Sequence, residues 1–153
     1  MSDASSGAAS VLAALRKAGD DAVSGAMLSD DLGVSRAQVW KHVGALRKRG
    51  YVIEGEPGGG YRLVDAPDRL YAEEIQPELR TRWLARSFEH LDETDSTNRV
   101  AFDRGRADAP AGLAVVAEHQ TAGRGRLGRS FYSPPHLNLY TSVLLEASGG
   151  IGP

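Results

Sequence analysis

The seven residues GRGRLGR at positions 123–129 restrict the local structures that are open to this part of the chain. Each glycine inside a helix costs about 0.5–1 kcal/mol relative to alanine, and the run offers one apolar side chain to bury in a sheet. We therefore predict a loop whose backbone N–H groups and guanidinium groups can surround a phosphate or a carboxylate. Taken alone, the run also fits a solvated linker or an arginine-glycine contact to nucleic acid. It is not a Walker loop, because no Lys-Ser or Lys-Thr pair closes it.

Two apolar segments flank this loop and are predicted strands. Residues 112–118 precede it and are almost wholly apolar, so we expect them to be buried on both faces, and residues 138–145 follow it. A loop that leaves the end of a buried strand is a common place for a ligand in α/β folds. Further upstream, residues 95–98 open a short helical pattern that ends near Gly105.

Three motifs together resemble the biotin protein ligase family: DSTN at 95–98, EHQTAGRGRLGR at 118–129 and FYSP at 131–134. They occur in the family's order and at similar spacing. The resemblance implies a mixed α/β catalytic domain for residues 88–153. It also implies a reaction in which the biotin carboxylate joins the α-phosphate of ATP, accompanied by Mg²⁺, with release of pyrophosphate. Biotin then passes to a lysine of a biotin carboxyl carrier protein.

The same resemblance assigns site residues. Arg124 and Arg126 match positions that bind biotin and the adenylate, and we expect them to be catalytic because guanidinium groups neutralise the charge between a carboxylate and ATP. A Ser-Thr-Asn trio at the start of a helix is also what capping favours, so residues 96–98 have a structural alternative. The other expected contacts to biotin or the adenylate are Ser96, Thr97, Asn98, Gln120, Gly123, Gly125, Arg129 and Phe131.

The chain also departs from the family pattern. Phe131 stands where the family usually has Trp, which keeps a ring for stacking but removes the indole N–H, and Leu127 stands where some members have another Arg. The family's catalytic lysine lies in a later segment, and this chain has no lysine after Lys48. We therefore expect the front portion of a ligase domain, incomplete at its C-terminal side and poorly active or inactive as a ligase alone.

The first 65 residues predict a winged helix-turn-helix. Apolar residues recur at helical spacing from Val11 to Ala18, around Leu28 up to Gly33, and after Ser35, the expected cap of the third helix. Residues 51–54 and 61–64 are expected strands joined by a glycine-rich wing. This region also resembles the helix-turn-helix of bifunctional family members that repress biotin biosynthesis, which implies operator DNA as a partner.

Charge in this domain is concentrated on the third helix. Residues 1–65 carry eight basic and eight acidic side chains, whereas residues 36–49 carry five basic ones and no acidic one. This local cationic surface favours contact with DNA. A helical domain that only packs or dimerises is the alternative, and for Trp40 alone half-burial is favoured over a base contact. The expected DNA-contacting residues are Ser35, Arg36, Gln38, Lys41, His42, Arg47 and Lys48.

The expected fold class is α+β, with a winged helix-turn-helix at 1–65, a linker and connecting helix at 66–87, and an incomplete mixed α/β ligase-type domain at 88–153. Helical spacing runs from Leu70 to Ala85, with Pro77 as a break or an early-turn residue. The chain has no cysteine, which excludes disulfides and fits the cytoplasm. It has no apolar run of the roughly 20 residues that a membrane span needs, and no visible metal-ligand cluster.

Two hypotheses follow. The first is a biotin protein ligase that also represses the biotin operon, with the ligand-linked homodimer that the resemblance implies. The second is a DNA-binding regulator that uses a remnant ligase domain as a biotin sensor. A lipoate ligase is disfavoured, because the motif at 123–129 resembles the biotin branch and a fused winged helix is typical of biotin ligases.

Overall fold

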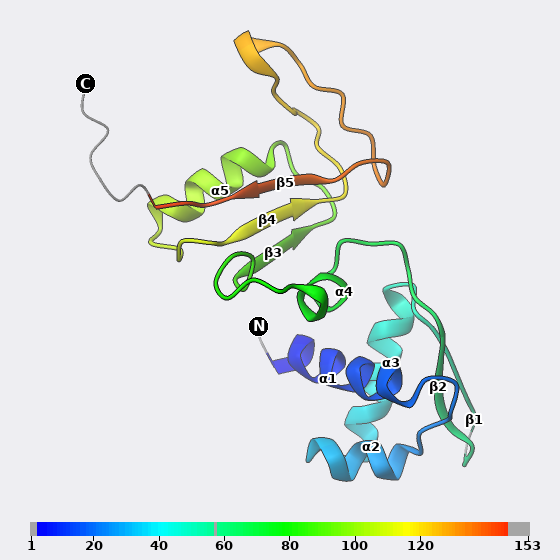
Figure 1. Cartoon of the computed structure of the whole chain (residues 1–153). Coiled ribbons are helices and arrows are strands. Elements are labelled where there is room, and N and C mark those ends of the chain that lie inside the picture. The colour runs from blue at the N-terminus through cyan, green and yellow to red at the C-terminus, as the bar shows by residue number, and fades with distance from the viewer. Residues whose placement is uncertain (1–2, 57, 147–153) are drawn as a thin grey trace. The chain divides into compact units, whose positions relative to one another are not determined.

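The computed structural model describes residues 3–56 and 58–146 of the 153-residue chain. The chain divides into two compact units, with the boundary between Asp68 and Arg69 (Figure 1). No helix in the described residues is both long enough and apolar enough to cross a membrane.

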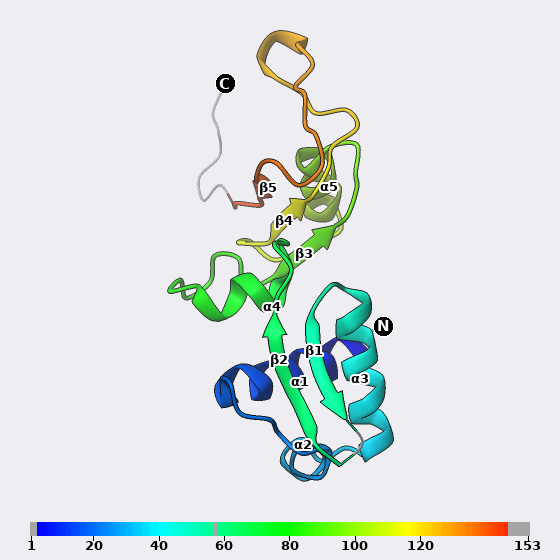
Figure 2. The same ribbon diagram turned by 90° about the vertical axis from the view of Figure 1, so that its right-hand side faces the viewer.

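The first unit is a three-helix domain with a β-hairpin (Figures 1 and 2). Its elements are α1 (Asp3–Ala18), α2 (Gly25–Leu32), α3 (Arg36–Lys48) and the antiparallel strands β1 (Val52–Glu56) and β2 (Gly60–Asp65). The predicted winged helix-turn-helix is confirmed, although α1 begins well before Val11. The apolar periodicity of the helices explains most of the core, to which Tyr51 and Ile53 are added from the chain after α3. The buried helical side chains include Val11, Leu12, Leu15, Leu28, Val39, Val43 and Leu46.

Local signals set the ends of α2 and α3. Gly33 has a φ of 63° and ends α2, donating its N–H to the carbonyl of Asp30, as expected for a left-handed cap. Two residues later a capping box opens α3. The N–H of Ser35 donates to Oε1 of Gln38 at 2.8 Å, and the N–H of Gln38 donates to Oγ of Ser35 at 3.2 Å. This pair fixes where the basic helix begins.

The second unit is built on a three-stranded mixed sheet in the order β3-β4-β5. Strand β4 (Ala114–Ala117) is central and wholly buried, and it pairs in parallel with β3 (Phe88–Leu91) and antiparallel with β5 (Tyr140–Val143). Helix α5 (Thr97–Arg106) covers one face (Figure 1). The predicted strands and helix of this unit are confirmed. Its core consists of Ala101, Leu113 and Val115, with Leu91, Val100, Ala109 and Leu144 packed around them.

The predicted break at Pro77 is confirmed, whereas the helical spacing predicted beyond it, up to Ala85, is wrong. Helix α4 (Ala72–Ile75) passes into the 3₁₀ turn η1 (Gln76–Glu78), and the chain then leaves helical geometry. Pro77 lies inside η1, where its missing N–H cannot continue an α-helix. After it, the guanidinium group of Arg86 donates to the carbonyls of Leu79 and Thr81, and these contacts hold an irregular turn in place of the expected helix.

Candidate functional site

Gln120 lies at the base of the arginine-rich loop (residues 123–129), where it connects the motif at 118–129 with the motifs at 95–98 and 131–134. Its Oε1 accepts hydrogen bonds from the backbone N–H of Thr97 at 2.8 Å and from the Thr97 hydroxyl at 3.1 Å. Its Nε2 donates to Oγ of Ser133 at 3.2 Å. The structure therefore brings residues 95–98, 118–129 and 131–134 together just after the carboxyl end of β4, at one amide side chain.

The Ser-Thr-Asn trio divides between the fold and the surface. Thr97 is buried, and besides Gln120 its hydroxyl lies 2.9 Å from Oγ of Ser142 on β5, so its polar atoms are used within the fold. Ser96 is the N-cap residue of α5, yet its side chain makes no capping hydrogen bond. Asn98 is exposed. The capping explanation thus does not account for the side chains of Ser96 and Asn98.

The arginine-rich loop is a narrow excursion that projects from the sheet (Figures 1 and 2). The N–H of Phe131 donates to the carbonyl of Gly123 at 2.8 Å, and the N–H of Gly125 donates to the carbonyl of Arg129 at 2.8 Å. Its tip is the short 3₁₀ turn η2 (Arg126–Gly128). The predicted loop is confirmed, and these backbone hydrogen bonds give it a defined root.

The three glycines of the loop have different roles. A Cβ atom on Gly123 would lie 2.6 Å from Oγ of Ser133 and 2.7 Å from the carbonyl oxygen of Phe131, so no side chain fits there. Gly128 has a φ of 73°, in the left-handed region that favours glycine. A Cβ atom on Gly125 would meet Arg129 at an ordinary 3.5 Å. Close packing therefore requires glycine at 123 and not at 125.

Among the described residues, no acid pairs with the arginines of this loop. Arg124, Arg126 and Arg129 are exposed, and within the part of the chain that the structure describes they have no ion-pair partner. Residues 119–145 contain no Asp or Glu at all. By contrast, the Arg99 guanidinium beside Asp95 lowers the pKa of that carboxyl to about 2. The loop guanidinium groups are therefore available to an anion from outside the fold.

A cavity of about 310 Å³ lies beside the root of the loop. Gln120 and Phe131 both line it, together with His119, Thr121 and residues 130–133. The Phe131 ring is 56% exposed, so an aromatic face is open to a ligand. The cavity thus combines an apolar surface with polar groups, as small-molecule sites commonly do.

Sequence reasoning missed a buried acid next to this site. Glu118 is 3% exposed, and its carboxylate accepts the backbone N–H of Leu70 at 2.9 Å and contacts Nε2 of His90 at 3.0 Å and Nδ1 of His136 at 3.3 Å. Burial raises the pKa of Glu118, but these hydrogen bonds together outweigh burial and leave the pKa below its usual value. In the sequence, Glu118 is the last residue of the segment expected to be buried and the first residue of the second motif, and neither fact indicated its partners.

Several residues expected to contact DNA have a local structural partner. Ser35 and Gln38 form the capping box. Arg47 donates from Nε and Nη2 to the carbonyl of Ile53 at 2.9 and 2.7 Å, which ties α3 to β1. A Cβ atom on Gly7 would lie 2.4 Å from Nε2 of His42, so this imidazole packs against α1. The three expected residues that remain, Arg36, Lys41 and Lys48, are exposed.

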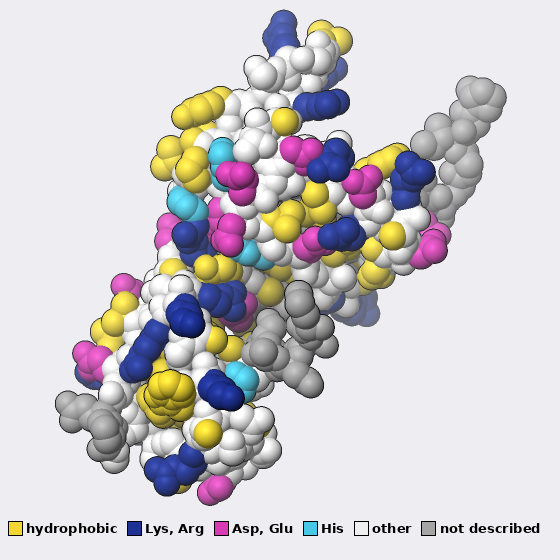
Figure 3. Space-filling view, turned by 180° about the vertical axis from the view of Figure 1, so that it is seen from behind, with side chains coloured by type: hydrophobic (Ala, Val, Ile, Leu, Met, Phe, Trp, Pro, Cys, Tyr) yellow, Lys and Arg dark blue, Asp and Glu magenta, His cyan; other side chains and the backbone are white. Residues whose placement is uncertain are grey.

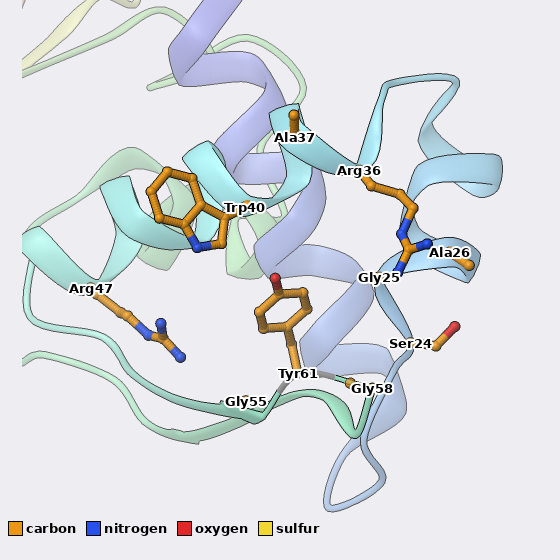
Figure 4. A pocket seen from close by; sticks show the side chains of 11 residues that line it. Ser24, Gly25, Ala26, Arg36, Ala37, Trp40, Arg47, Gly55, Gly58 and Tyr61 are labelled. Atoms are coloured by element: carbon orange, nitrogen blue, oxygen red, sulfur yellow. The ribbon is translucent and has the colours of Figure 1, made fainter.

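The half-burial expected for Trp40 is wrong, because its side chain is 66% exposed. It lines a cleft of about 610 Å³ between α3 and the hairpin, shown in Figure 4 with Arg36, Arg47 and Tyr61. The space-filling view shows basic side chains gathered on this face around hydrophobic surface (Figure 3). Periodicity placed Val39 in the core correctly, but its neighbour in sequence faces away from that core.

Two family models match this sequence: "HTH domain" over residues 8–62 and "Biotin/lipoate A/B protein ligase family" over residues 91–152. The chain is 40% identical over 130 residues, 85% of its length, to the "Bifunctional ligase/repressor BirA" of Bacillus subtilis. It is 39% identical over 127 residues, 83% of its length, to the protein of the same name from Escherichia coli. The chain spans only 40% and 38% of these two relatives.

Among solved structures, a biotin protein ligase from Leishmania major in complex with biotinyl-5-AMP is similar at 42% sequence identity. That similarity covers 37% of this chain and 22% of the other, with a TM-score of 0.32.

Proposed function

Since this chain joins a helix-turn-helix domain to a segment of the biotin/lipoate A/B protein ligase family, we propose that it is part of a biotin protein ligase that also represses the biotin operon. In the first step, a carboxylate oxygen of biotin bonds to the α-phosphorus of ATP, and pyrophosphate leaves. In the second, a lysine amine of a carrier protein attacks the carbonyl carbon of that mixed anhydride. AMP leaves, and the amine gives up a proton.

One observation carries the enzyme proposal: the loop that bears Arg124 and Arg126, exposed and without an ion-pair partner among the described residues, begins just after Gln120, which also lines the cavity. Biotin carboxylate and ATP are both anions, and their approach is opposed by charge repulsion. Arg124 and Arg126 have no acid to pair with in the described residues, so they can neutralise the two anions and the charge that develops on the leaving pyrophosphate. Arg129 adds a third positive charge at the end of the loop.

The hydrogen bonds of Gln120 fix the geometry of the cavity wall. Gln120 is held by Thr97 and Ser133, so the cavity wall that it shares with Phe131 has a fixed polar atom and an open ring. The ring of Phe131 can stack on a flat ligand group. Ser96, Asn98 and the backbone at Gly123 and Gly125 complete the surface that we assign to biotin and its adenylate.

Magnesium enters with the nucleotide. The described residues contain no group of three or more His, Cys, Asp or Glu side chains that could hold a metal ion. Mg²⁺ prefers oxygen ligands and is commonly bound through substrate phosphates, so in this proposal the phosphates of ATP hold it. The protein's part is then to bind the resulting complex through its arginines.

The repressor function rests on α3. Its exposed Arg36, Lys41 and Lys48 neutralise DNA phosphates. Arg47 adds to the same surface, because its hydrogen bond to the carbonyl of Ile53 leaves its positive charge in place. Operator DNA, a biotin carboxyl carrier protein and a second copy of the chain are the proposed macromolecular partners, in the cytoplasm. A homodimer would place two copies of α3 on two half-sites of the operator.

Isothermal titration of the 153-residue chain with biotin, repeated with ATP and Mg²⁺, tests the enzyme proposal. Biotin binding that is strengthened by the nucleotide supports ligase-type activation. Biotin binding that is indifferent to the nucleotide supports the alternative, a DNA-binding regulator that senses biotin without activating it. If a sample folded by circular dichroism gives no heat with either ligand, this chain contains no working biotin site.

A further inference from the structure

Trp40 leaves an unusually large apolar side chain in water. The neighbouring Val39 is fully buried, whereas the Trp40 indole is 66% exposed on the outer side of α3. An indole of this size forgoes hydrophobic stabilisation when it stays solvated, and exposed aromatic rings of this kind are enriched where a partner binds. The packing of the first unit thus gives no reason for tryptophan at this position.

The indole stands in a cationic cleft. Figure 4 shows Trp40 on α3 between Arg36 and Arg47, with Tyr61 projecting from the hairpin on the opposite side. Apart from Tyr61, the hairpin residues that line the cleft have no side chains, because they are the glycines Gly55, Gly58 and Gly60. Residues 36–49 contribute five positive charges and no negative one. An apolar ring that shares its cleft with Arg36 and Arg47, on a helix of net positive charge, suits a polyanion that also presents apolar groups.

Gly44 adds an independent observation. It lies one turn after Trp40 on the same side of α3, and a Cβ atom built on it would meet nothing within 4 Å. Glycine inside a helix is destabilising relative to alanine, and here no internal contact requires it. Because Gly44 has no side chain, the backbone of α3 beside Trp40 can approach an external surface closely.

Duplex DNA fits these features. Its major groove admits an α-helix, its phosphates match the basic side chains, and its one exposed apolar group is the C5-methyl of thymine. We propose that Trp40 is a specificity-determining residue, whose indole contacts a thymine methyl group while Arg36 and the lysines of α3 bind the flanking phosphates. This inference rests on the proposed DNA-binding function.

The test removes one methyl group at a time. Duplexes that bind the full chain are selected from a random library, and each thymine of a selected duplex is then replaced by uracil, which lacks only the C5-methyl. For the wild-type chain, we expect one replacement to weaken binding by about 3- to 10-fold. For Trp40→Ala, the same replacement should have no effect. A double-mutant cycle isolates this coupling.

A second experiment compares the affinities of the wild-type chain and the variants for the selected duplex and for an unrelated duplex. Trp40→Ala should weaken the selected duplex by about 10-fold or more and the unrelated duplex by less than about 2-fold. Met27→Ala, which removes another exposed hydrophobic side chain of the same unit (58% exposed), is the matched control and should change neither affinity. Thermal unfolding confirms that each variant is folded. In a Trp83→Phe background Trp40 is the only tryptophan left, and DNA should quench its fluorescence.

The outcomes separate the inference from its premise. If the wild-type chain binds no duplex, the DNA-binding function itself fails. If it binds, but uracil weakens the wild type and Trp40→Ala equally, or Trp40→Ala weakens every duplex to the same extent, Trp40 does not read thymine. Gly44→Ala should raise the melting temperature and still weaken the selected duplex. An unchanged affinity would contradict the close approach of α3.

Discussion

Charged side chains of the second unit divide into those that hold the fold together and those that the fold leaves open. Glu118 is buried and its oxygens are hydrogen-bonded on several sides, whereas Arg124 is exposed with no ion-pair partner among the described residues. Arg124 follows Glu118 by only six positions in the sequence. Glu118, just after β4, therefore stabilises the fold, whereas the arginines of the loop that follows are proposed to bind the anionic ligands.

Substituting Arg124 tests this division at the exposed end. We expect Arg124→Ala to weaken biotin binding, measured with ATP and Mg²⁺, by about 10- to 100-fold, the loss that removal of a charged hydrogen bond produces. The free energy of unfolding should change by less than about 0.5 kcal/mol, because the side chain has no ion-pair partner among the described residues. Leu127→Ala, in the same loop and 93% exposed, is the control and should leave both quantities unchanged. An equal loss of stability with unaltered ligand affinity would refute the assigned role.

Substituting Glu118 tests the buried end. Because its folded pKa lies below the unfolded value, Glu118 contributes stability that is present above the unfolded pKa of about 4.5 and is lost as the pH falls through the folded pKa. At pH 7 we expect Glu118→Gln to lower the free energy of unfolding by about 1–3 kcal/mol, since the hydrogen-bonded charge is removed. In urea titrations, the difference from wild type should shrink at acidic pH. A difference independent of pH would contradict this account.

At the scale of elements, the two functional segments follow different physical rules. Helix α3 is specified locally: the Ser35–Gln38 capping box starts it, and its buried side chains recur at helical spacing. The loop at 123–129 instead depends on contacts between the two chain segments at its base. The N–H of Phe131 donates to the carbonyl of Gly123, and Nε2 of Gln120 donates to Oγ of Ser133. Glycine is needed at Gly123 for that reason alone.

Replacing two glycines of the loop in parallel tests how its root is held. Gly123→Ala would push a methyl group into Ser133 and the carbonyl of Phe131, so the root must shift. We expect it to lose about 1–3 kcal/mol of stability and most of its affinity for biotin. Gly125→Ala meets only an ordinary contact at a φ of −88° and should be tolerated in urea unfolding. Equal effects of the two substitutions would show that packing at the root is not the determinant.

The connecting segment shows where local pattern fails. The apolar spacing from Leu70 to Ala85 predicted a helix with Pro77 as a break or an early-turn residue, and the segment forms a single helical turn followed by a 3₁₀ turn that contains Pro77. Pro77 ends the backbone ladder, and Arg86 then satisfies carbonyl groups that a helix would have used. Periodicity reports which side chains are apolar. It does not report that a side chain nine residues after a proline replaces the backbone donors.

At the scale of the molecule, each unit has a core of its own. The buried side chains of the first unit all come from residues before Asp68, and the β-hairpin is anchored by a pair of backbone hydrogen bonds at 2.8 Å between Val23 and Tyr61. We therefore expect a fragment of residues 1–68 to fold by itself, with one cooperative thermal transition. It should bind a duplex selected with the full chain within about 10-fold of the full chain, the difference that loss of dimer avidity allows. A fragment without a cooperative transition would show that the first unit depends on the second.

The winged helix-turn-helix, the loop at 123–129 and the strands on either side of this loop could be predicted from the amino-acid sequence, and so could a resemblance to the ligase family whose model matches residues 91–152. The structural predictions were possible because capping, helical periodicity and glycine content act over a few residues. The folded structure was needed to show that Gln120 joins Thr97 and Ser133, that Glu118 is buried beside His90 and His136, and that Trp40 lines a basic cleft. These facts depend on which surfaces meet once the sheet and the helices have packed, and such contacts join residues far apart in the chain.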